Sequence, residues 1–90
     1  MNTLLVSYDL VAPGKDYEPL WDFLKSHNSW ATPLLSVYLV KSQQTASDFL
    51  DSVRRHVDSN DKVIVIDVTG DTAAWVNLDP KVSEWIKSNI

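Results

Sequence analysis

The sequence predicts a single α+β domain in which short strands alternate with amphipathic helices. Its 90 residues fit one domain, so we expect residues 1–90 to form a single domain. Apolar side chains alternate with period two in some segments and recur at i, i+3 and i+4 in others, with turn residues between them. The apolar content of 44% is that of an ordinary globular protein.

Residues 3–10 predict the first strand, and its alternate positions differ in character. One set is apolar or aromatic and is expected to face the helices, whereas the other becomes polar and is expected on the open side of the sheet. The two sets are Leu4, Val6, Tyr8 and Leu10, and Thr3, Leu5, Ser7 and Asp9. A carboxylate at the end of a central strand is costly unless it is hydrated, hydrogen-bonded or metal-bound, so Asp9 is the candidate functional residue.

A turn predicted at residues 11–15 leads into a helix that is expected to begin near Asp16 and to end near His27 and Asn28. Asp16 can accept hydrogen bonds from the free amides of the first helical turn. The apolar stripe of this helix consists of Tyr17, Leu20, Trp21 and Leu24.

Residues 33–41 predict the second strand. It either continues as one bent strand or supplies a short further strand around residues 40–43. As one strand it presents two faces, which are Leu35, Val37 and Leu39, and Leu34, Ser36, Tyr38 and Val40.

The second half of the chain repeats this alternation. Residues 45–48 form a capping-box pattern that opens a second helix. The nearly continuous β-branched run at residues 62–69 predicts a central strand. Residues 72–76 are expected to form a short extra strand, and the Asp-Pro pair at residues 79–80 predicts the start of a C-terminal helix.

Strands and helices in this order predict a ferredoxin-like α+β sandwich, with an antiparallel or mixed sheet and helices on one face. The other sheet face would then be open in a monomer. It is expected to carry Leu5, Ser7, Asp9, Leu34, Ser36, Tyr38, Val40, Val63, Val65 and Asp67. This mixture is too apolar to be left to water, so we expect a homodimer. Such a dimer could in turn bind a protein partner.

Charge and composition restrict the classes of partner. The net charge is −4 and the pI is about 4.8, which argues against strong nucleic-acid binding because phosphate contacts depend on clustered Lys and Arg. The chain has no Cys, which is compatible with the cytoplasm. No membrane association is expected, because no signal-peptide pattern and no apolar run of ~20 residues occurs.

Carboxylates are the only groups that predict chemistry. His27 and His56 fall at predicted helix ends, so a Ser/His/Asp site is not expected. Mg²⁺ or Mn²⁺ can be held by one or two carboxylates plus water and a substrate phosphate. Asp9 and Asp67 are both expected near strand ends on the open face, and two copies of Asp9 could share an ion across a dimer axis. The alternative is that Asp9 is a solvated residue at the end of a strand.

The order of several short motifs resembles the CRISPR-associated protein 2 family. The apolar strand ending in Tyr8-Asp9, the triplet Ser36-Val37-Tyr38 and the apolar strand at residues 62–68 are similar to that family. The chain resembles more closely its short SinR-like relatives, which are mostly uncharacterised. The motifs shared with these relatives are Tyr8-Asp9-Leu10, Trp30, Leu39-Val40-Lys41, Asn60-Asp61-Lys62 and Val68-Thr69-Gly70.

The resemblance implies a ferredoxin-like dimer in which Asp9 of both protomers would be the catalytic metal ligand. The chain departs from the nuclease-type members at Leu39, where an acidic residue is common, and at residues 32–35, where basic residues are common. The expected function is therefore that of a non-catalytic or weakly active homodimer without a cofactor, for which a role with nucleic acid stays open. The alternative is a Mg²⁺- or Mn²⁺-dependent nuclease acting through Asp9.

Overall fold

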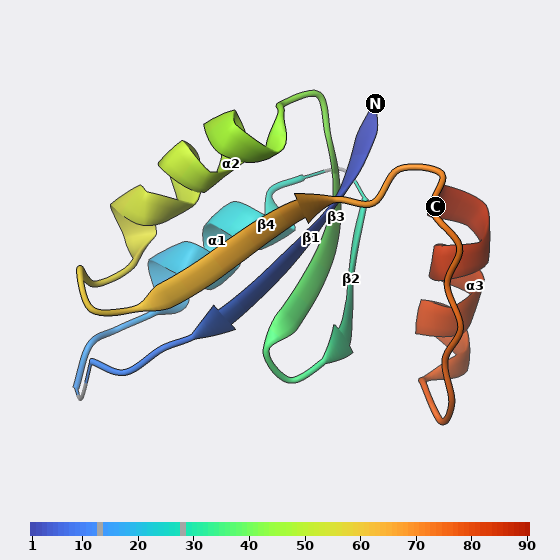
Figure 1. Cartoon of the computed structure of the whole chain (residues 1–90). Helices are drawn as coiled ribbons and strands as arrows, with labels where there is room; N and C mark the ends of the chain where they lie inside the picture. The colour runs from blue at the N-terminus through green and yellow to red at the C-terminus, as the bar shows by residue number, and fades with distance from the viewer. Residues whose placement is uncertain (13, 28) are drawn as a thin grey trace.

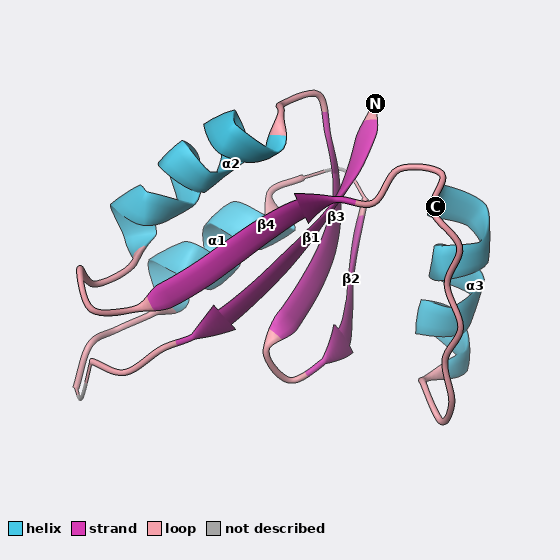
Figure 2. Ribbon diagram, in the orientation of Figure 1, coloured by secondary structure: helices cyan, strands magenta, loops and turns pink. Residues whose placement is uncertain are grey.

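A computed structural model describes residues 1–12, 14–27 and 29–90. They form one four-stranded antiparallel sheet and three α-helices, so the α+β class is confirmed (Figures 1 and 2). The strands are β1 (Asn2–Asp9), β2 (Trp30–Leu34), β3 (Val37–Ser42) and β4 (Lys62–Asp67), and the helices are α1 (Glu18–Lys25), α2 (Ala46–Val53) and α3 (Pro80–Asn89), with a 3-10 turn η1 (Arg54–His56) after α2. Among these helices none is long and apolar enough to cross a membrane.

The strand order in the sheet is β2-β3-β1-β4, with β1 between β3 and β4. Helices α1 and α2 cover the same face of this sheet (Figure 1). The β-branched run at residues 62–69 was expected to be a central strand, but β4 lies at the sheet edge and pairs only with β1. β-Branched residues suit any half-buried pleated surface, so their enrichment does not separate an edge strand from a central one.

The hydrophobic core lies between the sheet and helices α1 and α2. The alternation predicted for β1 is confirmed, since Leu4 and Val6 are fully buried in this layer. Fully buried residues of the helices pack against them, namely Leu20, Leu24, Phe49 and Val53. Burying each such side chain contributes about 1.5–3 kcal/mol relative to exposure, so this layer provides most of the driving force for folding.

Residues 33–41 were predicted as one strand, and this prediction is wrong. The chain turns back at Leu35 and Ser36, and β2 and β3 form an antiparallel hairpin. The expected further strand at residues 40–43 is the end of β3. This turn has no Asn-Gly or Asp-Gly pair, which is the strongest sequence signal for a short hairpin.

The two sets of alternating residues in β3 face the sides of the sheet opposite to those predicted. Tyr38 lies opposite Val6 and Val40 lies opposite Leu4. Residues directly opposite each other in a sheet share a face, so Tyr38 and Val40 belong to the core and not to the open face. A shift of one residue is enough to exchange the two faces of a strand.

The predicted faces of β4 are also wrong, as its pairing with β1 shows. Val65 lies opposite Val6, and Val63 lies opposite Tyr8, so both pack toward the helices. Asp67 lies opposite Leu4 and also leaves the predicted open set. We call the face away from α1 and α2 the open face. It is formed by Leu5, Ser7, Asp9, Leu34, Val37, Leu39, Ile64 and Ile66.

Helix α3 does not share the face of the other two helices, so the prediction of helices on one face is wrong for α3 (Figure 1). The Nζ atom of Lys41 donates to the Asn89 carbonyl and to the Thr3 hydroxyl, both at 3.0 Å. Thr3 and Lys41 lie opposite each other, one position away from the core pair, and therefore point to the open side. At the β2 edge, the Trp85 indole donates to the Ser29 hydroxyl at 2.8 Å.

Most predicted helix ends are close to those observed. Thr45 accepts a hydrogen bond from the Asp48 amide, and Asp79 accepts one from the Lys81 amide. Asp16 accepts from the Glu18 amide at 2.9 Å, but α1 begins two residues later than predicted.

Two predictions for the ends and loops of the chain are wrong, and part of a third lies outside the described residues. Helix α1 ends at Lys25, earlier than the predicted end near residues 27–28. Asn28 of that predicted end and Pro13 of the turn at residues 11–15 lie outside the described residues. Residues 72–76, which were expected to form a short strand, form none.

Replacing Lys41 by Met should loosen α3 while leaving the core intact. The substitution leaves the Asn89 carbonyl and Thr3 hydroxyl without their charged donor, and such hydrogen bonds contribute about 1.5–3 kcal/mol. We expect faster amide hydrogen exchange across residues 80–90 and little change in β1. The control is Lys87→Met on the exposed side of α3, and equal exchange in both variants would contradict the anchoring role of Lys41.

Candidate functional site

Asp9 is the last residue of β1 and is exposed on the open face. Its partner across the antiparallel pair is Lys62, the first residue of β4. A shallow hollow surrounds it, lined also by Ser7, Ser36 and Ile64. The structure thus places the predicted site residue at a polar end of an otherwise apolar face.

The chain that follows Asp9 is held by the carboxylate of Asp61. Asp61 accepts hydrogen bonds from the Val11 amide at 2.8 Å and from the Asp58 amide at 2.7 Å. The Tyr17 hydroxyl lies 2.7 and 2.9 Å from its two oxygens. Asp61 therefore joins the loop after β1, the start of α1 and the turn before β4. Sequence reasoning missed this role of Asp61, because its partners lie up to 50 residues away.

Hydrogen bonding also sets the ionisation of this pair. Partial burial opposes the charged form of Asp61, but the hydrogen bonds from Val11, Tyr17 and Asp58 outweigh it and lower the pKa of the carboxyl. Burial, followed by the hydrogen bond to Asp61, raises the pKa of the Tyr17 hydroxyl. The loop behind Asp9 is consequently held by an ionised acceptor at neutral pH.

The Asp9 carboxylate is available to a ligand. Within residues 1–12, 14–27 and 29–90 it makes no side-chain hydrogen bond and no ion pair. No group of three or more His, Asp or Glu side chains that could hold a metal gathers anywhere in these ranges. Mg²⁺ and Mn²⁺ sites commonly use one or two carboxylates, and one chain supplies a single carboxylate, that of Asp9, to this hollow.

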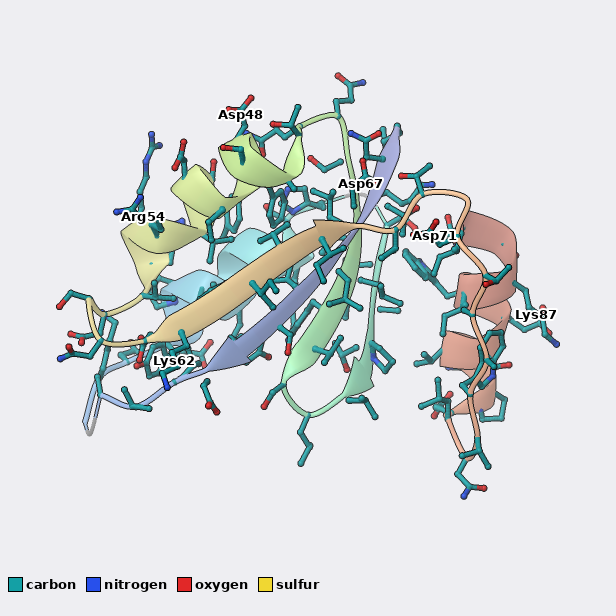
Figure 3. All side chains as sticks on the ribbon, in the orientation of Figure 1. Asp48, Arg54, Lys62, Asp67, Asp71 and Lys87 are labelled. Atoms are coloured by element: carbon teal, nitrogen blue, oxygen red, sulfur yellow. The ribbon has the colours of Figure 1, made fainter. Side chains whose placement is uncertain are left out.

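Asp67 is not brought near Asp9, contrary to the expectation that both lie together on the open face. Strands β1 and β4 are antiparallel, so Asp9 pairs with Lys62 whereas Asp67 pairs with Leu4, about 17 Å further along the sheet. Figure 3 shows Lys62 and Asp67 at opposite ends of β4. Asp67 instead accepts from the Thr69 amide and hydroxyl, and these hydrogen bonds lower its pKa.

Both histidines lie at helix ends, as expected. His27 follows α1 and His56 ends η1, and each ring lies against Phe23, with ring centroids 5.1 and 5.0 Å apart. Neither forms part of a Ser/His/Asp arrangement in the described parts of the chain. Their role here is packing at the end of the core.

Tyr8 points to the opposite side of the sheet from Asp9 and enters an aromatic cluster. Its ring lies 5.4 Å from Trp21, which lies 6.3 Å from Tyr38. Burial, with a smaller contribution from Tyr38, raises the pKa of Tyr8 to about 12. The Tyr8 hydroxyl is therefore a neutral hydrogen-bond donor at any physiological pH.

Comparison with known proteins does not assign the chain to a family. No protein-family model matches the chain, and no solved structure matches it.

Replacing Asp61 by Asn should reduce stability at neutral pH more than in acid. The folded-state pKa of Asp61 lies below the unfolded value of about 3.8, so its contribution is complete above that pH and is lost as the pH falls through the folded-state pKa. Urea unfolding of the wild type and Asp61→Asn should therefore differ at pH 7 and converge in acid, once the pH is below the folded-state pKa. Asp51→Asn on the exposed side of α2 is the control, and a difference that grows in acid would contradict this role.

Proposed function

We propose that the chain is a small homodimeric relative of the CRISPR-associated protein 2 family with a ferredoxin-like fold. The order β1-α1-β2-β3-α2-β4 and the sheet order β2-β3-β1-β4 support the fold, because they follow the β-α-β-β-α-β pattern. The motif resemblance at Tyr8-Asp9 and residues 36–38 supports the family. The proposed role is non-catalytic or weakly catalytic and nucleic-acid related, and the proposed location is the cytoplasm.

The exposed isoleucines of β4 carry the proposal of a homodimer. Ile64 and Ile66 occupy successive positions of the open face and are 54% and 45% exposed. Leu34, on the same face, is also exposed. Apolar side chains gathered on one face in this way are typical of an interaction surface. Helix α3 lies against the other part of the face, so a partner would pack against β1 and β4.

The position of Asp9 favours the nuclease alternative, because Asp9 lies on the same face as Ile64 and therefore beside the proposed dimer interface. A two-fold axis beside this end of β1 would bring two copies of Asp9 together, and each carboxylate is free of hydrogen bonds and ion pairs to the described residues. In such a site a bound Mg²⁺ or Mn²⁺ would activate water and stabilise charge on the phosphate. The chain itself would contribute the paired Asp9 carboxylates and the nearby Lys62 ammonium.

Charge favours weak activity over robust cleavage. Among the described residues that line the hollow at Asp9, Lys62 alone is cationic. The adjacent pair Arg54 and Arg55 lies beyond α2 and is exposed, and Arg54 makes a long ion pair with Asp51 at 3.9 Å. A net charge of −4 further weakens attraction to a phosphate chain.

The dimer is tested by placing a charge on the proposed interface. Ile66→Asp should convert the protein from about twice the chain mass of 10.2 kDa to a monomer, because an unpaired buried carboxylate is costly. Ser47→Asp adds the same charge on the exposed surface of α2 and should leave the mass unchanged. Light scattering during size-exclusion chromatography measures both, and a monomeric wild type would contradict the proposal.

The metal site is tested by thermal unfolding with Mg²⁺ or Mn²⁺. A ligand that binds only the folded state raises the melting temperature, so the ions should raise it slightly in the wild type and in Asp67→Asn, and not in Asp9→Asn. We expect no robust cleavage of RNA or DNA by any of the three proteins. Strong metal-dependent cleavage that is lost in Asp9→Asn would instead establish the nuclease alternative.

A further inference from the structure

The middle of strand β4 carries none of the features that usually prevent two sheet edges from pairing. An edge strand presents unpaired backbone N–H and C=O groups, and proteins commonly shield them with Pro, a β-bulge, charged side chains or a covering segment. Residues 63–66 are all Val or Ile, and the charges of Lys62 and Asp67 stand only at the two ends of the strand. The register between β1 and β4 is unbroken, and among the described residues no further strand pairs with β4.

The opposite edge of the same sheet is shielded. Strand β2 contains Pro33, and its register with β3 is irregular between Ala31 and Leu34. Helix α3 lies at this edge, where the Trp85 indole donates to the Ser29 hydroxyl (Figure 1). The contrast between the two edges indicates that a further strand is added at β4 and not at β2.

The hydrogen bonds to β1 show which backbone groups of β4 point outward. The Val68 amide donates to the Thr3 carbonyl at 2.9 Å, directly beyond the paired residues of the two strands. Backbone groups alternate in direction along a strand, so even-numbered residues of β4 bond to β1. The N–H and C=O groups of Val63, Val65 and Asp67 therefore point away from β1, toward the free edge.

We propose that β4 of a second copy of this chain pairs with this edge in antiparallel orientation, with Val65 of both copies at the two-fold axis. In this register Val63 lies opposite the partner's Asp67, so the outward backbone groups of the two copies face each other. Residues that share a face of the sheet also meet, because Ile64 lies opposite the partner's Ile66. The inference rests on the proposed homodimer and specifies how its two copies meet.

The apolar side chains of β4 support a second copy as the added strand. Ile64 and Ile66 are 54% and 45% exposed on the open face, and the pairing brings the isoleucines of both copies into one apolar patch. On the helix side, Val63 and Val65 are only partly buried by their own chain. Both faces of the joined strands therefore gain apolar contacts.

The charges at the ends of β4 select the register. With Val65 at the axis, Lys62 lies opposite the partner's Val68 and Asp67 lies opposite the partner's Val63, so no like charges face each other. The register in which Ile64 faces its own copy places Asp67 opposite the partner's Asp61. Like charges directly opposite are destabilising, so that register is disfavoured.

The same register separates the two copies of Asp9. Asp9 pairs with Lys62 at the start of β4, and in the dimer the two Lys62 residues lie about 20 Å apart along the joined strands. The two Asp9 carboxylates therefore cannot share an ion in this dimer. The β4 pairing agrees with the non-catalytic form of the proposed function, whereas the nuclease alternative needs a different dimer.

Amide hydrogen exchange of the full chain tests the pairing directly. The amides of Val63, Val65 and Asp67 should exchange at least about tenfold more slowly in concentrated than in dilute protein, because they are hydrogen-bonded only in the dimer. The amides of Ile64 and Ile66 bond to β1 and should be protected at both concentrations. Light scattering on the same samples measures the mass.

Two substitutions at one position separate the backbone hydrogen bond from the side chain. Val65→Pro removes the outward amide but no hydrogen bond to β1, and edge strands tolerate Pro at such positions. It should weaken dimerisation more than about tenfold, because both hydrogen bonds across the axis are lost. Val65→Ala is the control, since it also shortens the side chain but keeps the amide, and it should still dimerise. Circular dichroism checks folding, and if Val65→Pro does not fold, the exchange rates of the wild type decide.

Different results would overturn the pairing and the homodimer. A dimer in which the amides of Val63, Val65 and Asp67 exchange as fast as in dilute protein would overturn the β4 pairing and leave the homodimer standing. A folded Val65→Pro protein that dimerises like Val65→Ala would do the same. New protection at residues 72–76 would show that this segment is the added strand, which also overturns the pairing. A wild type that stays monomeric at every concentration would contradict the homodimer itself.

Discussion

The position of β1 between β3 and β4 determines the rest of the structure. Its residues alternate between the two faces of the sheet, and residues 4–7 have a partner on both sides. Val6, for example, lies opposite Tyr38 and Val65, so all three face the helices. Burial of this row beneath α1 and α2 fixes the register, because a slip of one residue would exchange the two faces. The same constraint places Asp9 and the isoleucines of β4 together on the open face.

Local features of the fold could be predicted from the sequence. The alternation in β1 and the caps at Thr45 and Asp79 are set by nearest neighbours, and the structure confirms them. The β2–β3 hairpin was missed because the turn at Leu35 and Ser36 has no Asn-Gly or Asp-Gly pair. The faces of β3 and β4 were predicted the wrong way round because alternation groups residues on a face without showing which face the helices cover. The apolar stripe of α3 does not show on which side of the sheet the helix packs. That side depends on the hydrogen bonds that Lys41 makes to Thr3 and Asn89, and Lys41 and Thr3 are distant from α3 in the sequence.

The candidate site was predictable in part for the same reason. Asp9 was identified from its place at a strand end, which is a local property. Its supposed partner Asp67 was excluded only by the antiparallel pairing of β1 and β4, which puts the two residues at opposite ends. The Asp61 network gathers residues from distant segments, so it has no signature in any single stretch of sequence.

The central claim is that one apolar face, held by β1 and left uncovered by α1 and α2, is the surface through which the protein acts. Methyl NMR spectra recorded over a range of protein concentrations test it most directly. The account predicts that the methyl signals of Leu5, Ile64 and Ile66 change with concentration while those of the core residues Leu4 and Leu20 do not. Signals that are independent of concentration in a monomer, or changes centred on the helix side, would contradict it.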